Sequence, residues 1–474
     1  MSIFSTQTIL FILAAVGTFH ILPVNRRPFL LLAASLLFYA LIQPGYLPLL
    51  LAGCLAVWWI ARRLSGPDES FRKSWLWTGI LVAVAPLLLF KYADLMIRTA
   101  ADVLDCKAPL LHLLAPLGIS FYTFRMISYL VDVYARRGSA ESNPLFVILY
   151  ISWFPQILSG PIERAGAMMD RLKNPAVPEM DRAIRRIMAG LFKKMVIAER
   201  LALFVDPVFR DPSAYAGINL VFAAFFFYLQ IYCDFAGYTD LAVGISELLG
   251  IRSSENFDHP LSSRSVSEFW RRWHITLSFW LRDYIFLPLS YALLRRARNW
   301  SPGTAEISVY ITATTATMFI AGLWHGAGWN FVVWGLLHAL FMSVSHITRR
   351  RRKRLRRALG LHRRRTIRRR LQWIFTFTLL SFTWVFFRSS TIGGALDYLG
   401  SMSLKMSGIG WAHLGATLGF ALAFVLAETG SRRGWWSKLT PSSPFVRALL
   451  VAMASCILIL LSVDGSNEFI YFRF

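Results

Sequence analysis

Apolar runs follow one another along this chain, separated by short polar breaks. The run from Ile307 to Thr348 contains no Asp, Glu, Lys or Arg, whereas a helix needs only about 20 mostly apolar residues to cross a bilayer. Backbone polar groups find no partner in lipid, so such runs must form helices or be covered by protein. The pattern therefore predicts a bundle of membrane helices rather than a series of soluble domains.

Five apolar runs in the first third of the chain predict five helices. They lie near Ile3–Leu22, Phe29–Leu41, Leu47–Ile60, Trp75–Phe90 and Leu110–Val133. Basic residues gather in alternate breaks, at Arg26-Arg27, between Arg62 and Lys73, and at Arg136-Arg137. Because cytoplasmic loops collect Lys and Arg, we expect these breaks in the cytoplasm and the N-terminus outside. The first run lacks a basic start and a small-residue cleavage site, so we expect it to stay as an anchor.

The middle of the chain is less regular. The apolar segment Asn143–Ile162 contains three prolines and a glycine, which predicts a broken or re-entrant segment covered by protein. Basic and apolar residues recur at helical spacing over Glu179–Arg200, as in an amphipathic helix that lies in the cytoplasmic interface. Later helices are predicted near Ile218–Tyr232, Phe235–Leu249, Leu371–Phe387, Leu414–Leu426 and Val446–Leu461, with two elements over Ile307–Ile347.

The composition agrees with a membrane protein. Of 474 residues, 56% are hydrophobic and 16% are charged, and the mean hydropathy is +0.49. Soluble domains are about 45–50% apolar and roughly a quarter charged. The four cysteines are scattered at no metal-binding spacing, so neither a disulfide framework nor a metal site is predicted. With no internal repeat in view, residues 1–474 are expected to form a single membrane domain.

The net charge of +25 is unevenly distributed. More than half of it lies in residues 349–370, a run that has no acidic residue. A run this basic could bind nucleic acid. It also lies between two apolar segments, where cytoplasmic loops collect basic residues that contact anionic headgroups at about 1 kcal/mol each. We therefore predict a basic cytoplasmic loop and no nucleic-acid partner.

His325 lies near the middle of the uncharged run, in the sequence GLWHGAGWNF. An ionisable side chain inside such a run is a functional candidate by default, and imidazole titrates in the range that a general base needs. The three neighbouring glycines weaken a helix and give other backbone or a ligand room to approach. The alternative is a buried histidine bonded to a backbone carbonyl, which is the preferred interpretation for His338 and His346.

The segment from Arg264 to Leu289 has the strongest pattern. Its tryptophans and leucines recur at helical spacing and predict an aromatic and apolar stripe. Arg271, His274 and Ser278 follow at intervals of three and four, which would place them together on the neighbouring face of a helix. The alternative is an interfacial helix that Trp and Arg anchor.

Two carboxylates, Asp234 and Asp240, lie in a neutral and aromatic region, YLQIYCDFAGYTDLAVG. Carboxylates at membrane depth are costly and are usually paired or face a polar cavity. Arginines of the Arg264–Arg282 region are the expected partners. A buried ion pair that fixes helix packing and a direct role at a site are both open.

In combination, the motifs resemble the membrane-bound O-acyltransferases, and within them the branch of the alginate O-acetyltransferase membrane subunit. The motifs that carry the resemblance are PLGISFYTFRMISYLVDVY, FPQILSGPI, YLQIYCDFAGYTDLAVG, ENFDHP, SEFWRRWHITLSFWLRDYIFLPL and GLWHGAGWNFVVWG, in this order. The resemblance implies an all-α polytopic membrane protein with roughly 11–14 transmembrane or re-entrant helices around a central funnel. It also implies a multi-pass protein of the bacterial inner membrane.

For the site, the resemblance implies that His325 is the active-site histidine and that His274 is the second histidine of the family. Candidate substrate-binding residues are Trp324, Arg271, Ser278, Asp234 and Asp240. The implied reaction moves an acetyl group from a cytoplasmic thioester, with acetyl-CoA as the co-substrate, to hydroxyls of an extracytoplasmic polysaccharide such as alginate. His325 would act as general base, and His274 would orient a reacting group or donate a hydrogen bond to the oxyanion. No bound cofactor or metal is implied, and a separate extracytoplasmic transferase is expected as partner.

Other functions fit parts of the sequence. The acceptor could instead be peptidoglycan, cellulose, another exopolysaccharide, a D-alanylated polymer or a lipid. Outside the enzyme class, the histidines could line the path of a transporter, or the chain could be a scaffold that docks a periplasmic transferase. Consumption of a labelled acyl thioester would distinguish the enzyme from the other two.

Overall fold

The computed structural model describes residues 5–66, 69–215, 217–360, 364–403, 411–435, 443–463 and 470. Within these residues the regular elements are all helices and no β-strand occurs. Seven of the helical segments are long and apolar enough to cross a membrane. They are Val24–Ile42, Pro44–Leu64, Arg72–Val103, Ile218–Leu248, Pro302–His325, Trp329–Ile347 and His413–Arg432. The predicted all-α polytopic membrane protein is therefore confirmed, and the central funnel stays a prediction.

The chain divides into two compact units, and each is described by itself. The first contains Met1–Ile187 and Thr239–Glu255, and the second contains Met188–Tyr238 and Asn256–Phe474. Both Ile187 and Tyr238 lie inside helices, so the chain passes between the units without a linker at either point.

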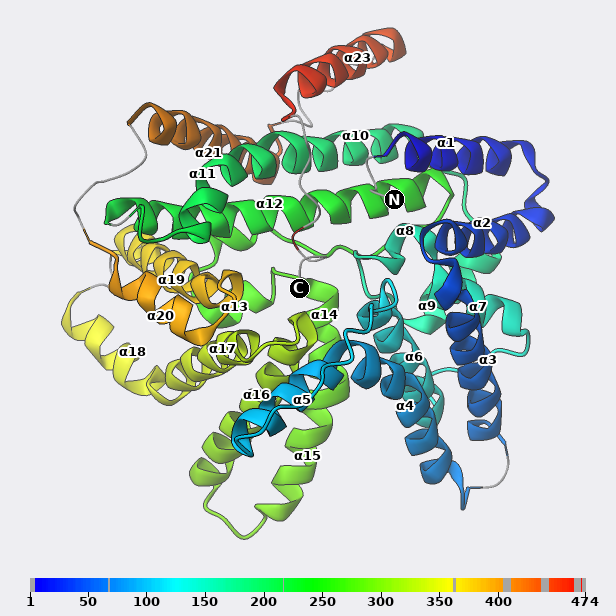
Figure 1. Ribbon diagram of the computed structural model, residues 1–474, viewed down its shortest axis with the longest axis horizontal. Helices are drawn as coiled ribbons and strands as arrows, with labels where there is room; N and C mark the ends of the chain where they lie inside the picture. The colour runs from blue at the N-terminus through cyan, green and yellow to red at the C-terminus, as the bar shows by residue number, and fades with distance from the viewer. Residues whose placement is uncertain are drawn as a thin grey trace. The chain divides into compact units, whose positions relative to one another are not determined.

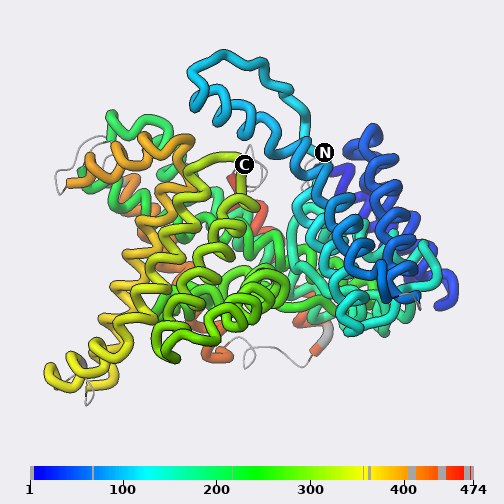
Figure 2. Tube along the Cα trace, turned by 90° about the horizontal axis from the view of Figure 1, so that it is seen from below, coloured from blue at the N-terminus to red at the C-terminus, as the bar shows by residue number. Residues whose placement is uncertain are grey.

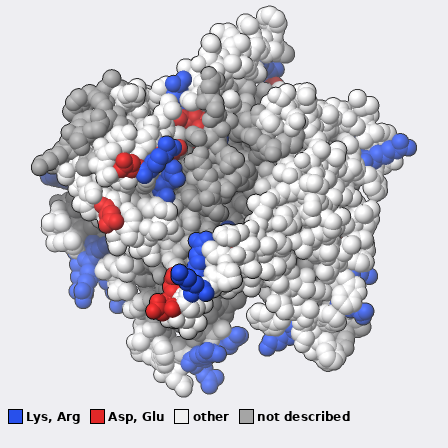
Figure 3. All heavy atoms as spheres, in the orientation of Figure 1, with Lys and Arg blue, Asp and Glu red and all other residues white. Residues whose placement is uncertain are grey.

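The helices of the first unit lie close to the predicted runs (Figure 1). They are α1 (Thr6–Ile21), α2 (Arg27–Ile42), α3 (Leu47–Leu64), α4 (Arg72–Leu87), α5 (Ala93–Val103), α6 (Ile119–Tyr134), α7 (Pro144–Ser152), α8 (Phe154–Ile157), α9 (Ala165–Lys173) and the start of α10 (Met180–Leu191). Helices α3, α4 and α6 pack against one another. In Figure 2, α5 and the coil after it extend away from these three helices. Over α1 to α4 the surface is largely uncharged, and Lys and Arg lie near helix ends (Figure 3).

Helix α6 begins at Ile119, so the helix predicted from Leu110 was wrong at its start. The preceding apolar residues are coil because side chains bind their backbone. The Asp94 carboxylate accepts hydrogen bonds from the N–H groups of Leu111 and His112, and the Gln43 side chain accepts one from Leu117. Gly118 then turns the chain at φ +72°, where a Cβ would lie 2.2 Å from a carbonyl oxygen.

The proline-containing segment is broken, as predicted. Helix α7 ends at Ser152, Trp153 turns the chain, and α8 is a single turn. The buried Arg125 side chain on α6 donates hydrogen bonds to the carbonyl oxygens of Tyr150, Ile151 and Gln156. One guanidinium therefore satisfies the carbonyls that the break frees from helical bonding.

The second unit begins within α10 and continues through a π-helical segment, η4 (Phe192–Ala198). The further helices are α11 (Glu199–Arg210), α12 (Ile218–Leu248), α13 (Val266–Trp270), α14 (Ile275–Leu281), α15 (Leu287–Arg296), α16 (Pro302–His325), α17 (Trp329–Ile347), α18 (Arg349–Ala358), α19 (Arg365–Arg388), α20 (Ile392–Gly400), α21 (Trp411–Arg432) and α23 (Pro444–Leu461). The residues of α12 after Tyr238 belong to the first unit. Helices α16 and α17 form the predicted pair of elements, joined by a short turn.

Two predictions fail in this unit. The segments predicted as Ile218–Tyr232 and Phe235–Leu249 form one helix of 31 residues. The segment predicted as one helix over Arg264–Leu289 is broken into α13, α14, a π-helical turn and the start of α15. Within the basic run, α18 covers the first ten residues and α19 begins at Arg365, and the cytoplasmic location of the run stays a prediction. Residues 361–363 of this run lie outside the described part of the chain. Figures 1 and 2 show α18 projecting from the end of α17.

Candidate active site

His325 is the last residue of α16, next to the turn that leads into α17. Its side chain is buried, with a fractional exposure of 3%. Three aromatic rings surround the imidazole, with centroid distances of 4.9 Å to Trp324, 5.0 Å to Trp334 and 5.2 Å to Phe387. The imidazole therefore lies in a low-dielectric aromatic cage at a helix end.

The glycines near His325 serve helix packing. A Cβ on Gly322 would lie 2.4 Å from the carbonyl oxygen of Phe331, and one on Gly326 would lie 2.2 Å from the Phe331 ring. The first of these two glycines brings the backbones of α16 and α17 together. The space that the sequence suggested for backbone or a ligand is filled by α17 and its Phe331 ring.

His274 lies at the break between α13 and α14, where its φ of +42° is in the left-handed region. Its side chain is fully buried. The Nδ1 atom lies 3.0 Å from Oδ1 of Asn256, and this oxygen also accepts hydrogen bonds from the N–H and hydroxyl of Thr276 at 3.3 and 2.9 Å. Asn256 thus holds both the histidine and the first turn of α14.

These contacts define the tautomer of His274. The backbone N–H of Thr276 can only donate, so the atom of Asn256 that faces it must be the amide oxygen. That oxygen can only accept, so Nδ1 of His274 carries a proton. His274 lies outside the seven candidate spans, and burial lowers the pKa of its imidazole to about 3. The ring is therefore neutral at physiological pH, and its buried Nε2 atom is a lone-pair acceptor without a hydrogen bond among the described residues.

The indole ring of Trp324 connects the two histidines. Its centroid lies 5.7 Å from that of His274 and 4.9 Å from that of His325. The Phe235 ring also packs against His274, and the centroids of these two rings lie 4.7 Å apart. The structure thus brings together three of the residues predicted for the site.

Arg271 and Ser278 do not join this group. The left-handed turn at His274 breaks the helix, so the common face predicted for Arg271, His274 and Ser278 does not exist. The Arg271 side chain is exposed. The Ser278 hydroxyl donates a hydrogen bond to the carbonyl oxygen of Trp273 at 3.1 Å.

Asp234 forms a buried ion pair in the second unit. Its carboxylate lies 2.6 Å from Nζ of Lys194, which also pairs with Glu199 at 2.7 Å. The backbone N–H of Ile470 donates a further hydrogen bond to Asp234. The prediction that Arg264–Arg282 supplies the partner was wrong, because a lysine of the preceding π-helical segment does so.

Asp240 belongs to the first unit, where it pairs with Arg186 at 2.6 Å. Arg186 also binds Glu255 through two hydrogen bonds, at 2.9 and 2.6 Å. The expected partner from Arg264–Arg282 was wrong here too. These contacts fit the alternative in which the carboxylates fix helix packing.

Two features of the site were not assigned from the sequence. Asn256 lies in the ENFDHP motif, which was quoted only as part of the resemblance. The aromatic wall formed by Trp334 and Trp384, whose rings lie 5.3 Å apart, comes from α17 and α19. Among the described residues, no group of three or more His, Cys, Asp or Glu side chains could hold a metal ion.

Comparisons with known proteins identify the family of the chain. The sequence model of the MBOAT, membrane-bound O-acyltransferase family matches residues 134–389, which include both histidines. The chain is 32% identical to the probable alginate O-acetylase of Pseudomonas aeruginosa, over 82% of this chain and 72% of that protein. It is 30% identical over the full length of both chains to the corresponding protein of Pseudomonas putida. It is also 32% identical to the peptidoglycan O-acetyltransferase of Helicobacter pylori, over 81% of this chain and 75% of that protein.

This chain belongs to the membrane-bound O-acyltransferase family, as the motifs indicated. It is a multi-pass membrane protein and an O-acyltransferase.

Proposed function

We propose that the chain takes an acetyl group from acetyl-CoA on the cytoplasmic side and moves it toward hydroxyls of an extracytoplasmic polysaccharide of the alginate type. The observation that carries the proposal is the pair of buried histidines whose imidazoles both lie next to one indole, that of Trp324. A buried pair of imidazoles in a chain of this family suits acyl transfer to a hydroxyl.

His325 is the proposed general base. It takes the proton as the acceptor hydroxyl attacks the thioester carbonyl, and the C–S bond then breaks as the ester C–O bond forms. The proton passes to the departing thiolate, so the histidine returns to its neutral state. Positioned proton transfer of this kind contributes typically about 10²–10⁴-fold.

His274 is the proposed positioning group. Since its Nδ1 proton is engaged by Asn256, the neutral ring offers Nε2 as an acceptor. This favours orientation of a donor, such as the attacking hydroxyl, over donation to an oxyanion. Trp324, between the two imidazoles, would hold the reacting groups against its indole face.

The acceptor is the part of the proposal that rests on relatives. Two are named for alginate and one for peptidoglycan, at 30–32% identity. The alginate type is proposed because both Pseudomonas relatives carry that name, and one of them aligns with this chain over the full length of both proteins. The chain is proposed to lie in the bacterial inner membrane, and a separate extracytoplasmic transferase is proposed to complete the transfer to the polymer.

The direct test uses the full chain in lipid nanodiscs with acetyl-CoA labelled in the acetyl group. We expect release of free CoA and transfer of label to oligoalginate when the partner transferase is added. Peptidoglycan fragments and cellulose oligomers serve as competing acceptors. If only peptidoglycan fragments became labelled, the acceptor in the proposal would be peptidoglycan, and the acyltransferase activity would stand. No consumption of thioester with any acceptor, although the partner binds, would favour the scaffold.

A further inference from the structure

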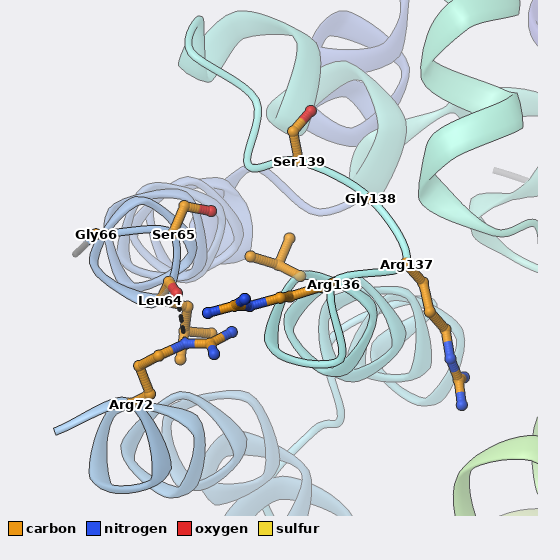
Figure 4. Close-up of a pocket in the computed structure, with 9 residues that line it drawn as sticks. Leu64, Ser65, Gly66, Arg72, Arg136, Arg137, Gly138 and Ser139 are labelled. Atoms are coloured by element: carbon orange, nitrogen blue, oxygen red, sulfur yellow. Dashed lines mark hydrogen bonds between the residues drawn. The ribbon is translucent and has the colours of Figure 1, made fainter. Parts of the chain in front are cut away.

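A cavity in the first unit lies outside the candidate active site. It has a volume of about 450 Å³ and lies where α3 ends, α4 begins and α6 ends. Figure 4 shows its lining residues, which are Leu64, Ser65, Gly66, Arg72, Val133, Arg136, Arg137, Gly138 and Ser139. Three of them are arginines, and none is acidic.

Two guanidinium groups face the cavity. In Figure 4, Arg72 and Arg136 extend toward each other, whereas Arg137 points away. Arg72 is held rigidly, because its Nε atom donates to the carbonyl oxygen of Leu64 at 3.0 Å and its Nη2 atom donates to that of Tyr134 at 2.7 Å. Its side chain is only 14% exposed. The cavity therefore has one preorganised positive charge.

Arg136 occupies an unusual backbone position for its type. Its φ of +56° follows the end of α6, where glycine is the common residue. The carboxylate of Glu69 pairs with Arg136 and lies 4.0 Å from Nη1 of Arg72. Because the Glu69 side chain is 71% exposed, its attraction to the two arginines is weakened by water. An anion with more charge and better geometry would displace it.

We propose that this cavity binds a phosphate group carried by the headgroup of an anionic phospholipid. Guanidinium groups match phosphate oxygens through paired, charge-assisted hydrogen bonds. The cavity lies at the shared end of two candidate spans, Pro44–Leu64 and Arg72–Val103, which is the level of lipid headgroups. The basic breaks that line it are those expected on the cytoplasmic side, where anionic lipids gather. The proposal does not depend on the proposed acyl transfer.

The test counts lipids bound to the detergent-solubilised full chain by native mass spectrometry. Phosphatidic acid and phosphatidylglycerol are compared with phosphatidylcholine, and inorganic phosphate is the soluble competitor. We expect the anionic lipids to bind at least roughly tenfold more tightly than phosphatidylcholine, as one or two charged hydrogen bonds would give. Equal binding of all three lipids would overturn the proposal.

The variants separate binding from folding. Arg136→Gly keeps the left-handed turn favourable, so the chain should remain folded while anionic-lipid affinity falls roughly tenfold. Arg137→Gln removes the same charge from the next residue, whose side chain points away, and should change affinity little. Glu69→Gln should tighten binding by removing the competing carboxylate. Equal losses in Arg136→Gly and Arg137→Gln would mean general attraction rather than a site. Displacement of lipid by millimolar inorganic phosphate would overturn the lipid assignment and make a soluble phosphate the ligand.

Discussion

At the scale of single residues, the chemistry proposed for this chain depends on burial. His325 is 3% exposed and His274 is fully buried, and aromatic rings cover both. For His274, desolvation disfavours the charged form of the imidazole and lowers its pKa, so this ring is neutral. A neutral ring can act as base or acceptor at physiological pH, which is what deprotonation of a hydroxyl requires.

We expect His325→Gln to abolish acetyl transfer, by about 10²-fold or more if the imidazole is the general base. Glutamine retains a hydrogen-bonding end of similar size but cannot take up a proton at neutral pH. The measurement is CoA release from labelled acetyl-CoA with the partner present. His338→Gln is the matched control, since His338 is another buried histidine that faces Trp270 and Thr383 instead. A glutamine variant at 325 that keeps near wild-type turnover would leave His325 with a packing role.

Asn256 should set the pH range in which His274 works. With a pKa of about 3, His274 stays neutral from pH 8 down to pH 5, so its protonation should not limit activity there. Asn256→Asp places a carboxylate against Nδ1, and a neighbouring negative charge raises the pKa of an imidazole. In this variant His274 therefore takes up a proton at a higher pH than in the unchanged chain. Protonation removes the Nε2 lone pair, so activity should fall on the acidic side of the profile. A pH–rate profile between 5 and 8 measures this, and an unchanged acid limb in the aspartate variant would count against the positioning role.

At the scale of elements, periodicity predicted where most helices lie but not where they break. Tryptophan and leucine recur at helical spacing through His274, yet the helix is interrupted between α13 and α14. At this break Asn256, 18 residues before His274, binds the imidazole and accepts a hydrogen bond from the first turn of α14. The opposite error occurs at Asp234. The two predicted helices left a gap at this residue, but its carboxylate pairs with Lys194 and α12 runs through the gap as one helix of 31 residues. Both outcomes depend on tertiary contacts that local spacing does not contain. The partners of Asp234 and Asp240 were also mispredicted because they come from tertiary contacts.

The close contact between α16 and α17 gives an element-scale prediction. Gly322→Ala places a methyl group 2.4 Å from the Phe331 carbonyl oxygen, and backbone cannot move aside as a flexible side chain can. We expect a loss of stability of about 1–3 kcal/mol, as for overpacking in a core. Thermal unfolding of the purified chain measures it. Gly303→Ala in the same helix is the control, because nothing lies within 4 Å of the added Cβ. That change should stabilise α16 by up to about 1 kcal/mol, so equal effects of the two substitutions would contradict the packing argument.

At the scale of the whole molecule, the class of polytopic helical membrane protein was predictable. Each apolar segment must both be hydrophobic enough for lipid and satisfy its own backbone hydrogen bonds, and these two requirements act on every segment. Seven apolar helices long enough to span a bilayer follow from that constraint. The division into two compact units was not predictable, since it cuts through α10 and α12 rather than through a polar linker. Composition marks boundaries only where a linker separates domains.

Orientation in the membrane gives the last prediction. Because cytoplasmic loops collect basic residues, we expect α18 in the cytoplasm. The basic break before Arg72 is expected there too, and one span follows it, so the coil around Cys106 is expected outside. Both positions can be labelled, because Cys106 is exposed and Lys353 lies on the exposed α18. In a Cys456→Ser background that also carries Lys353→Cys, an impermeant thiol reagent added to intact cells with a permeable outer envelope should modify Cys106 and spare position 353. Position 353 should react only after the membrane that holds the chain is opened. Cys54 and Cys233 are buried and should stay silent in both conditions. Because the arginines around position 353 cannot cross the bilayer without large cost, a single orientation is expected. Labelling of position 353 from outside would contradict the cytoplasmic assignment of α18.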